Sequence, residues 1–123
     1  MIKQDWIMNQ IESLAMFIAK VFFKKDTTDY YVPVPDALTD TDRLHYELLE
    51  LIGENRINDA EDLLFERMDT ADMKYLEVSV DFYARLNDKT DEELEAAEFS
   101  REEIEEGLHD AAKLFGVNLM DIN

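Results

Sequence analysis

The chain has no cysteine, and it has three glycines and two prolines among its 123 residues. Without cysteine, disulfide bonds, thiol catalysis and zinc sites built on cysteine are excluded. So few glycines and prolines leave little material for a turn-rich β architecture. The most apolar stretch, AMFIAKVFFKK at residues 15–25, has about half the length that a bilayer-spanning helix needs.

Basic residues are scarce, because 12 lysines and arginines face 30 aspartates and glutamates, for a net charge of −18. Residues 1–25 carry four lysines against two acidic residues, so the +2 of this segment leaves −20 for the rest of the chain. Nucleic acid is a poor partner for such a surface, since phosphate binding needs a basic footprint. We expect a protein partner or self-association instead, although acidic helix faces also simply keep small proteins soluble.

The start of the chain does not read as a signal peptide. Asp5 and Glu12 precede the apolar stretch, and Lys24 and Lys25 stand where a small-residue cleavage site would follow. We therefore expect a cytoplasmic protein. With 46% apolar residues, residues 1–123 are long enough for one helical domain, with an N-terminal helix at 1–25, a linker at 26–39 and an acidic helical core at 40–123.

Apolar residues recur at spacings of three and four along most of the chain, which indicates an all-α fold. The first helix, about 4–24, has two apolar stripes. One is expected to face the core: Ile7, Ile11, Leu14, Ile18, Val21 and Phe22. The other is expected to meet the linker or another chain: Met16, Ala19 and Phe23.

Pro33 and Pro35 predict an extended linker, which Tyr30 and Tyr31 could pin to the domain surface. Further helices are predicted at 42–55, 57–68, 70–87, 91–97 and 101–115, with Asp40 or Thr41 as the first N-cap. Two capping boxes mark the last two helices, Thr90 with Glu93 and Ser100 with Glu103. The fold class is an antiparallel bundle or a set of tetratricopeptide-like hairpins with five to six helices, and the helix at 70–87 should be the most enclosed.

The segment LHYELLELIGENRINDAEDLLFE, residues 44–66, resembles one tetratricopeptide helix hairpin. The resemblance rests on apolar residues in the first helix, and on a small residue in the second with a leucine four positions later: Leu44, Leu48, Leu51, Ile52, Ala60 and Leu64. Asn55 and Arg67 depart from the usual small residues of that pattern. A generic antiparallel hairpin therefore fits the segment nearly as well.

Taken whole, the chain resembles a family of small bacterial proteins of unknown function. The resemblance is carried by QDWIMNQIESLAMFIAKVFFKK at the start, GENRINDAEDLLFE in the middle and FSREEIEEGLHDAAKLFG near the end. It implies a tetratricopeptide-like helical fold and brings no catalytic residues with it.

Candidates for chemistry are few. Each of the two histidines ends a carboxylate-x-x-His spacing, Asp42 with His45 and Glu106 with His109. Di-iron helical bundles use such pairs, but further inward-facing glutamates are needed and none is evident here. We expect two surface or boundary histidines, no catalytic residue, no cofactor and no metal site.

The sequence thus favours a non-enzymatic protein-interaction module, adaptor-like or scaffold-like. Its candidate interaction surface consists of residues on the first helix: Trp6, Met16, Phe17, Ala19, Lys20 and Phe23. One alternative is a peripheral membrane protein that uses the same amphipathic helix, although the acidic remainder would be repelled by anionic lipid. A metal-binding helical bundle is the less favoured alternative.

Overall fold

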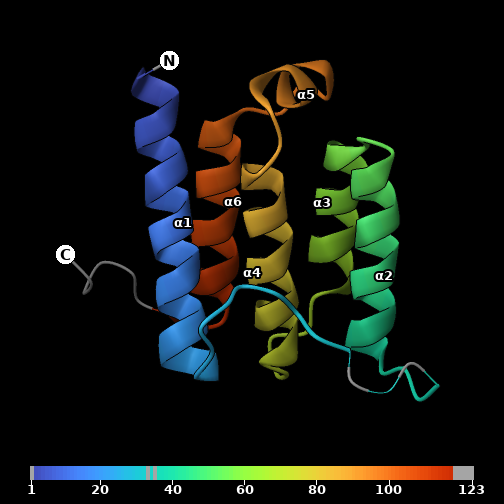
Figure 1. The fold of residues 1–123 in the computed structure, drawn as a ribbon. Coiled ribbons are helices and arrows are strands. Elements are labelled where there is room, and N and C mark those ends of the chain that lie inside the picture. Colours follow the sequence, from blue (N-terminus) through green and yellow to red (C-terminus); the bar gives the residue numbers. More distant parts are fainter. Residues whose placement is uncertain (1, 33, 35, 118–123) are drawn as a thin grey trace.

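The computed structural model describes residues 2–32, 34 and 36–117, and this part of the chain is all-helical, as predicted. It contains six helices: α1 (Ile2–Phe23), α2 (Asp40–Gly53), α3 (Ile57–Arg67), α4 (Lys74–Asn87), α5 (Asp91–Ala96) and α6 (Arg101–Leu114). Figure 1 shows α4 between the α2–α3 hairpin on one side and α1 with α6 on the other. The short α5 lies at one end of the bundle, and the linker crosses α4 on its way from α1 to α2 (Figure 1).

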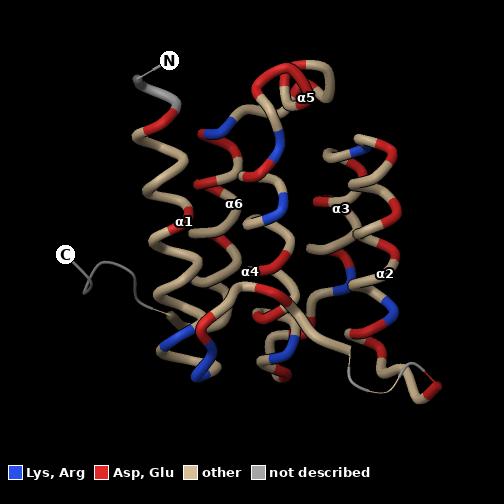
Figure 2. The backbone as a smooth tube through the Cα atoms, viewed as in Figure 1, with Lys and Arg blue, Asp and Glu red and all other residues tan. Residues whose placement is uncertain are grey.

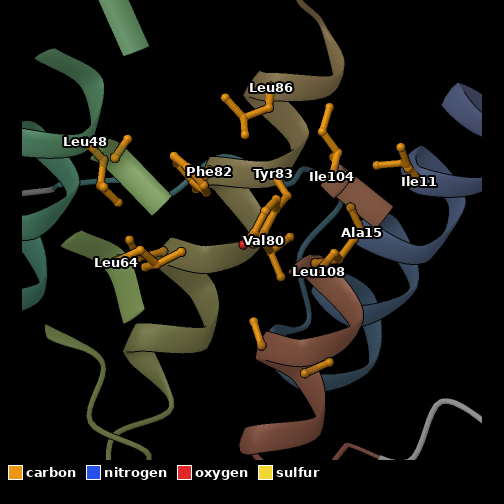
Figure 3. Close-up of a cluster of buried hydrophobic side chains, with 14 of the residues drawn as sticks. Ile11, Ala15, Leu48, Leu64, Val80, Phe82, Tyr83, Leu86, Ile104 and Leu108 are labelled. Atoms are coloured by element: carbon orange, nitrogen blue, oxygen red, sulfur yellow. The ribbon is translucent and has the colours of Figure 1, made fainter. Parts of the chain in front are cut away.

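Helix α4 is the most enclosed element, which confirms the prediction for this segment. Nine of its fourteen residues are buried, so it presents apolar side chains on more than one side. Figure 3 shows Phe82 on the side of Leu48 and Leu64, whereas Tyr83 and Val80 lie toward α6 and α1. A single buried cluster therefore runs from the α2–α3 hairpin through α4 to α1 and α6.

The core-facing stripe of α1 differs in part from the predicted one. Ile7, Ile11 and Ile18 are buried as expected, but the centre of the buried face passes through Ala15. Val21 and Phe22, predicted as core, are 46% and 40% exposed. The reason is geometric: α1 packs mainly on α4 and α6, which cover its last turn only in part, so these two side chains reach solvent.

Helix boundaries follow local capping chemistry. The Thr90–Glu93 and Ser100–Glu103 capping boxes are both present, and they begin α5 and α6. The N-cap of α2 is Thr39 and not Asp40 or Thr41, because its hydroxyl accepts the backbone N–H of Asp42. At the end of α6, Gly116 has a φ of 82°, the left-handed conformation that stops a helix at glycine.

Gly107 is required where α6 crosses α4. A Cβ at this position would come within 2.6 Å of Cε1 and Cζ of Tyr83, whose ring is fully buried. The ring passes beside Gly107 so that its hydroxyl can donate a 2.6 Å hydrogen bond to Glu61 on α3. Glycine on α6 thus allows one tyrosine to join three helices.

We predict that Gly107→Ala destabilises the protein by about 1–3 kcal/mol, because the tyrosine ring has no room to move aside in a packed core. The matched control is Gly53→Ala, since a Cβ there meets nothing within 4 Å. That control should change the free energy of unfolding by less than about 1 kcal/mol, in the stabilising direction. Urea denaturation of both variants measures the difference, and equal stabilities would contradict the proposed role of Gly107.

Candidate interaction surface

The side of α1 that faces away from α4 and α6 forms a continuous stripe, which we term the outer face. Its members follow one another along the helix at spacings of mostly three or four residues: Trp6, Gln10, Ser13, Phe17, Lys20 and Val21. All are exposed except Phe17, which is half-buried at the edge of the core. Trp6 is 62% exposed, which is unusual for the largest apolar side chain.

The outer face also differs in charge from the surrounding surface. None of its residues is acidic, and Lys20 lies near its C-terminal end, with Lys24 just beyond the helix. In Figure 2 acidic positions are spread over the bundle and few lie on α1, whereas basic positions gather at the lower end of α1, where the sequence has Lys20, Lys24 and Lys25. The outer face therefore combines three apolar side chains, two uncharged polar side chains and one lysine, on a protein with a net charge of −18.

The structure places only three of the six residues of the predicted interaction surface on the outer face. Trp6, Phe17 and Lys20 lie together on the outer face. Ala19 is 2% exposed, so it belongs to the core and not to a surface. Met16 and Phe23 are half-buried, and Phe23 packs against the core cluster.

The second predicted stripe of α1 lies beside the start of the linker. Met16 lines a cavity of about 350 Å³ together with linker residues Thr27 and Thr28. The backbone carbonyl of Ala19 accepts a hydrogen bond from the N–H of Lys25, where the chain turns away from α1. On this side of α1 Ala19 is buried, whereas Met16 and Phe23 are half-buried, so the protein's own chain covers it only in part.

Sequence reasoning missed Val21 as a surface residue because its spacing from Leu14 and Ile18 suits a core stripe. The signal that could have found it lies in the small residues. Ala15 and Ala19 allow close helix packing, so the face that contains them is the buried one, and Val21 lies off that face.

The linker is held in place by a buried carboxylate at the centre of α4. Asp81 is 2% exposed, and its Oδ2 accepts a 2.8 Å hydrogen bond from the backbone N–H of Tyr30. Its Oδ1 accepts a 2.7 Å hydrogen bond from Nε of Arg85, one turn further along the helix. The carboxylate therefore has a charged partner on its own helix and a backbone partner on the linker.

The side chain of Tyr30 extends this attachment to α2. Its hydroxyl donates a 2.6 Å hydrogen bond to Oδ1 of Asp42 and lies 2.7 Å from Oγ1 of Thr41. Burial and the hydrogen bond to Asp42 raise the pKa of Tyr30 to about 12. The prediction that the linker is pinned is confirmed for Tyr30, whereas Tyr31 is 75% exposed.

Asp42 remains ionised in this setting. Burial alone would raise its pKa, but hydrogen bonds from Thr39 and Tyr30 outweigh it and lower the pKa below the usual value. The same carboxylate completes the capping box of α2, because its Oδ2 accepts the backbone N–H of Thr39. Asp42 therefore serves the start of α2 and the linker together.

His45 lies inside the same cluster, contrary to the expectation of a surface or boundary histidine. It is 5% exposed, its ring centroid is 5.0 Å from that of Tyr30, and its Nδ1 lies 3.7 Å from Oδ1 of Asp81. Burial lowers the pKa of His45, against the attraction of Asp81. Arg85 already neutralises that carboxylate at 2.7 Å, so the imidazole gains little from being charged.

The two carboxylate-x-x-His pairs differ in burial. Asp42 and His45 are buried and engaged with the linker, whereas Glu106 and His109 are exposed on α6. Within the described ranges, no group of three or more His, Cys, Asp or Glu side chains is arranged to hold a metal ion. A Glu-x-x-His site with further glutamates is thus not formed by these residues.

The fold and surface define a small acidic helical protein whose first helix has an outer face without acidic residues and whose buried polar groups hold a linker. Residues 1–116 match the model of a family of unknown function, DUF6483, and the chain belongs to this family. No curated protein and no solved structure matches the chain significantly. Of the helices described, none has both the length and the apolar character required to cross a bilayer.

We predict that Asp81→Ala destabilises the protein by about 2–4 kcal/mol, because it leaves the buried Tyr30 N–H without an acceptor and removes the partner of Arg85. Asp88→Ala is the matched control, since Asp88 is exposed at the end of the same helix. It should change the free energy of unfolding by less than about 0.5 kcal/mol. Chemical denaturation tests the pair, and an Asp81 variant as stable as its control would rule out the anchoring role.

The depressed pKa of His45 predicts a loss of stability on acidification. Below about pH 6.5 the unfolded chain binds a proton at this histidine while the folded protein does not, so stability falls as the pH is lowered through that range. His45→Gln should remove this component from the pH dependence of the urea midpoint. His109→Gln should leave it unchanged, because His109 is exposed. If the urea midpoints of the His45→Gln variant and of the unmodified protein fall by the same amount as the pH is lowered, the prediction is wrong.

Proposed function

We propose that this protein is a non-enzymatic interaction module that binds another protein chain through the outer face of α1. The observation that carries the proposal is the exposed stripe with Trp6 at one end and Lys20 at the other. Tryptophan and half-buried aromatic residues dominate the energetics of protein interfaces when a partner covers them. On the outer face, exposed or partly exposed apolar side chains alternate with uncharged polar ones, a mixture that is common in protein interfaces.

The buried polar groups support an adaptor or scaffold rather than an enzyme. Asp81 and Asp42 are engaged with Tyr30 and with their own helices, and Ser79 donates to the backbone carbonyl of Tyr75. These groups stabilise the arrangement of the linker and helices. In this proposal the protein acts by offering one face of a helix to a partner, and it does not catalyse a reaction.

The proposal can be tested with a photoreactive amino acid, p-benzoylphenylalanine, in cells that naturally make the protein. We expect the probe at Gln10, on the outer face, to give a discrete protein adduct on irradiation. The same probe at Glu106, exposed on α6, should not give that adduct. The captured protein is then identified, purified and mixed with this chain, and Trp6→Glu should weaken the measured binding about thirtyfold or more.

Two results would count against the proposal. If the Gln10 probe gives no protein adduct and the purified chain sediments with anionic vesicles at low salt, the outer face binds membrane surfaces instead. If it gives neither an adduct nor vesicle binding, the outer face has no binding role. Equal binding of the partner by the Trp6→Glu variant would likewise exclude this face as the docking site.

A further inference from the structure

The outer face of α1 has a pattern that is complementary to itself. Trp6, Ser13 and Lys20 are separated by seven residues each, so they fall on one line along the helix. The aromatic residue lies at one end of this line, the lysine at the other and a small residue at the centre. Turning the helix end over end about Ser13 places tryptophan where lysine was, and lysine where tryptophan was.

From this pattern we infer that the occupant of the outer face is the α1 helix of a second copy of this chain, packed antiparallel about a twofold axis at Ser13. The inference rests on the proposed function and specifies its partner. A twofold interface uses the same patch on both copies, so each favourable contact forms twice. Here Trp6 of each copy lies against Lys20 of the other, in a cation–π contact.

The residues between these ends suit a close helix pair. Ser13 at the axis has a small side chain, which lets two helices approach in the middle. Gln10, one turn away, is uncharged, and its amide can donate and accept hydrogen bonds across the pair. Phe17 and Val21 add apolar surface that is partly exposed in a single copy. The two Lys20 side chains lie on opposite sides of the axis, about 21 Å apart along the helices, so they do not repel strongly.

The charge distribution favours self-association through the outer face over the other surfaces of the protein. Outside residues 1–25 the chain carries −20, so contacts between other faces of two copies would set acidic side chains against each other. The outer face includes no acidic residue, and Figure 2 shows the acidic positions concentrated on other elements. Two copies can therefore meet here with less local repulsion than over the acidic helices.

The same charge limits the strength of the dimer and makes it depend on salt. Two chains of charge −18 repel each other at long range, and added salt screens this repulsion. One helix pair also lies at the small end of specific interfaces, so the dissociation constant should be micromolar. The affinity of the two copies for each other should therefore rise with salt concentration. Binding of a basic partner to the acidic surface would instead weaken as salt is added.

Sedimentation equilibrium of the full chain provides the first test. We expect a reversible shift from 14.4 kDa to twice that mass at micromolar concentrations, and more dimer at higher salt. Trp6→Glu should raise the dissociation constant at least about tenfold while circular dichroism shows a folded protein. Tyr31→Glu is the matched control, because Tyr31 is an aromatic residue that is 75% exposed on the linker, and it should leave the dimer unchanged.

Single cysteines test the geometry, because the chain has none of its own. Under mild oxidation Ser13→Cys should give a disulfide-linked dimer in high yield, since the two positions meet at the axis. Gln10→Cys should not, because each position 10 lies three residues from the axis, which separates the two positions by about 9 Å along the helices, beyond disulfide reach. Crosslinking of both variants would overturn the antiparallel arrangement.

Failure of this inference can be told apart from failure of the proposed function. A chain that stays monomeric at all concentrations and salt conditions, with no Ser13→Cys crosslink, overturns self-association. If the Gln10 photoprobe then captures a different protein in a Trp6-dependent manner, the interaction module stands with another partner. If the photoprobe instead captures a second copy of this chain, the dimer and the module are supported together.

Discussion

The structure depends on the carboxylate of Asp81, buried at the centre of the most enclosed helix. A buried charge is costly unless it is paired and hydrogen-bonded, and here Arg85 and the backbone of Tyr30 supply both kinds of partner. One partner belongs to α4 itself and the other to the linker, so the carboxylate has both hydrogen-bond partners only when the linker lies across α4. The route of the chain between α1 and α2 is therefore part of the core and not a passive connection.

This arrangement explains why the linker can be extended and still be held at one place. Its backbone has few partners in regular structure, and the Tyr30 side chain reaches Thr41 and Asp42 at the start of α2. The polar cluster joins the helix hairpin to α4 through directional contacts, in addition to apolar packing. Such contacts favour one arrangement of the helices over others that would bury similar apolar area.

Much of the helical framework was predictable from the sequence because it is encoded locally. Apolar spacings of three and four located the helices, and capping boxes at Thr90 and Ser100 located two of their starts. The neighbours of α1 were not predictable in this way, because they depend on tertiary packing, and Val21 was therefore assigned to the wrong side. Asp81 carried a signal that was not used: an acidic residue between apolar stripes of an enclosed helix must have a partner.

The candidate site was only partly predictable. The sequence indicated that the first helix has surplus apolar surface, and two residues of its predicted interaction surface, Trp6 and Lys20, are exposed. Periodicity alone could not show which apolar stripe of α1 lies beside the linker, because that depends on where residues 26–30 turn back over the bundle. The buried position of His45 was unpredictable for the same reason, since Tyr30 and Asp81 come from distant parts of the chain.

The packing of α1 has a consequence for how the chain is made. The helices that cover its apolar stripe, α4 and α6, end at Asn87 and Leu114, so they leave the ribosome long after α1 does. Until then Ile11, Ile18 and the outer face are exposed together on a nascent helix. Contacts of such large sequence separation slow folding, and a long-lived apolar helix is a natural target for chaperones. The acidic segments that follow residue 25, by their charge, repel those of neighbouring nascent chains during this interval.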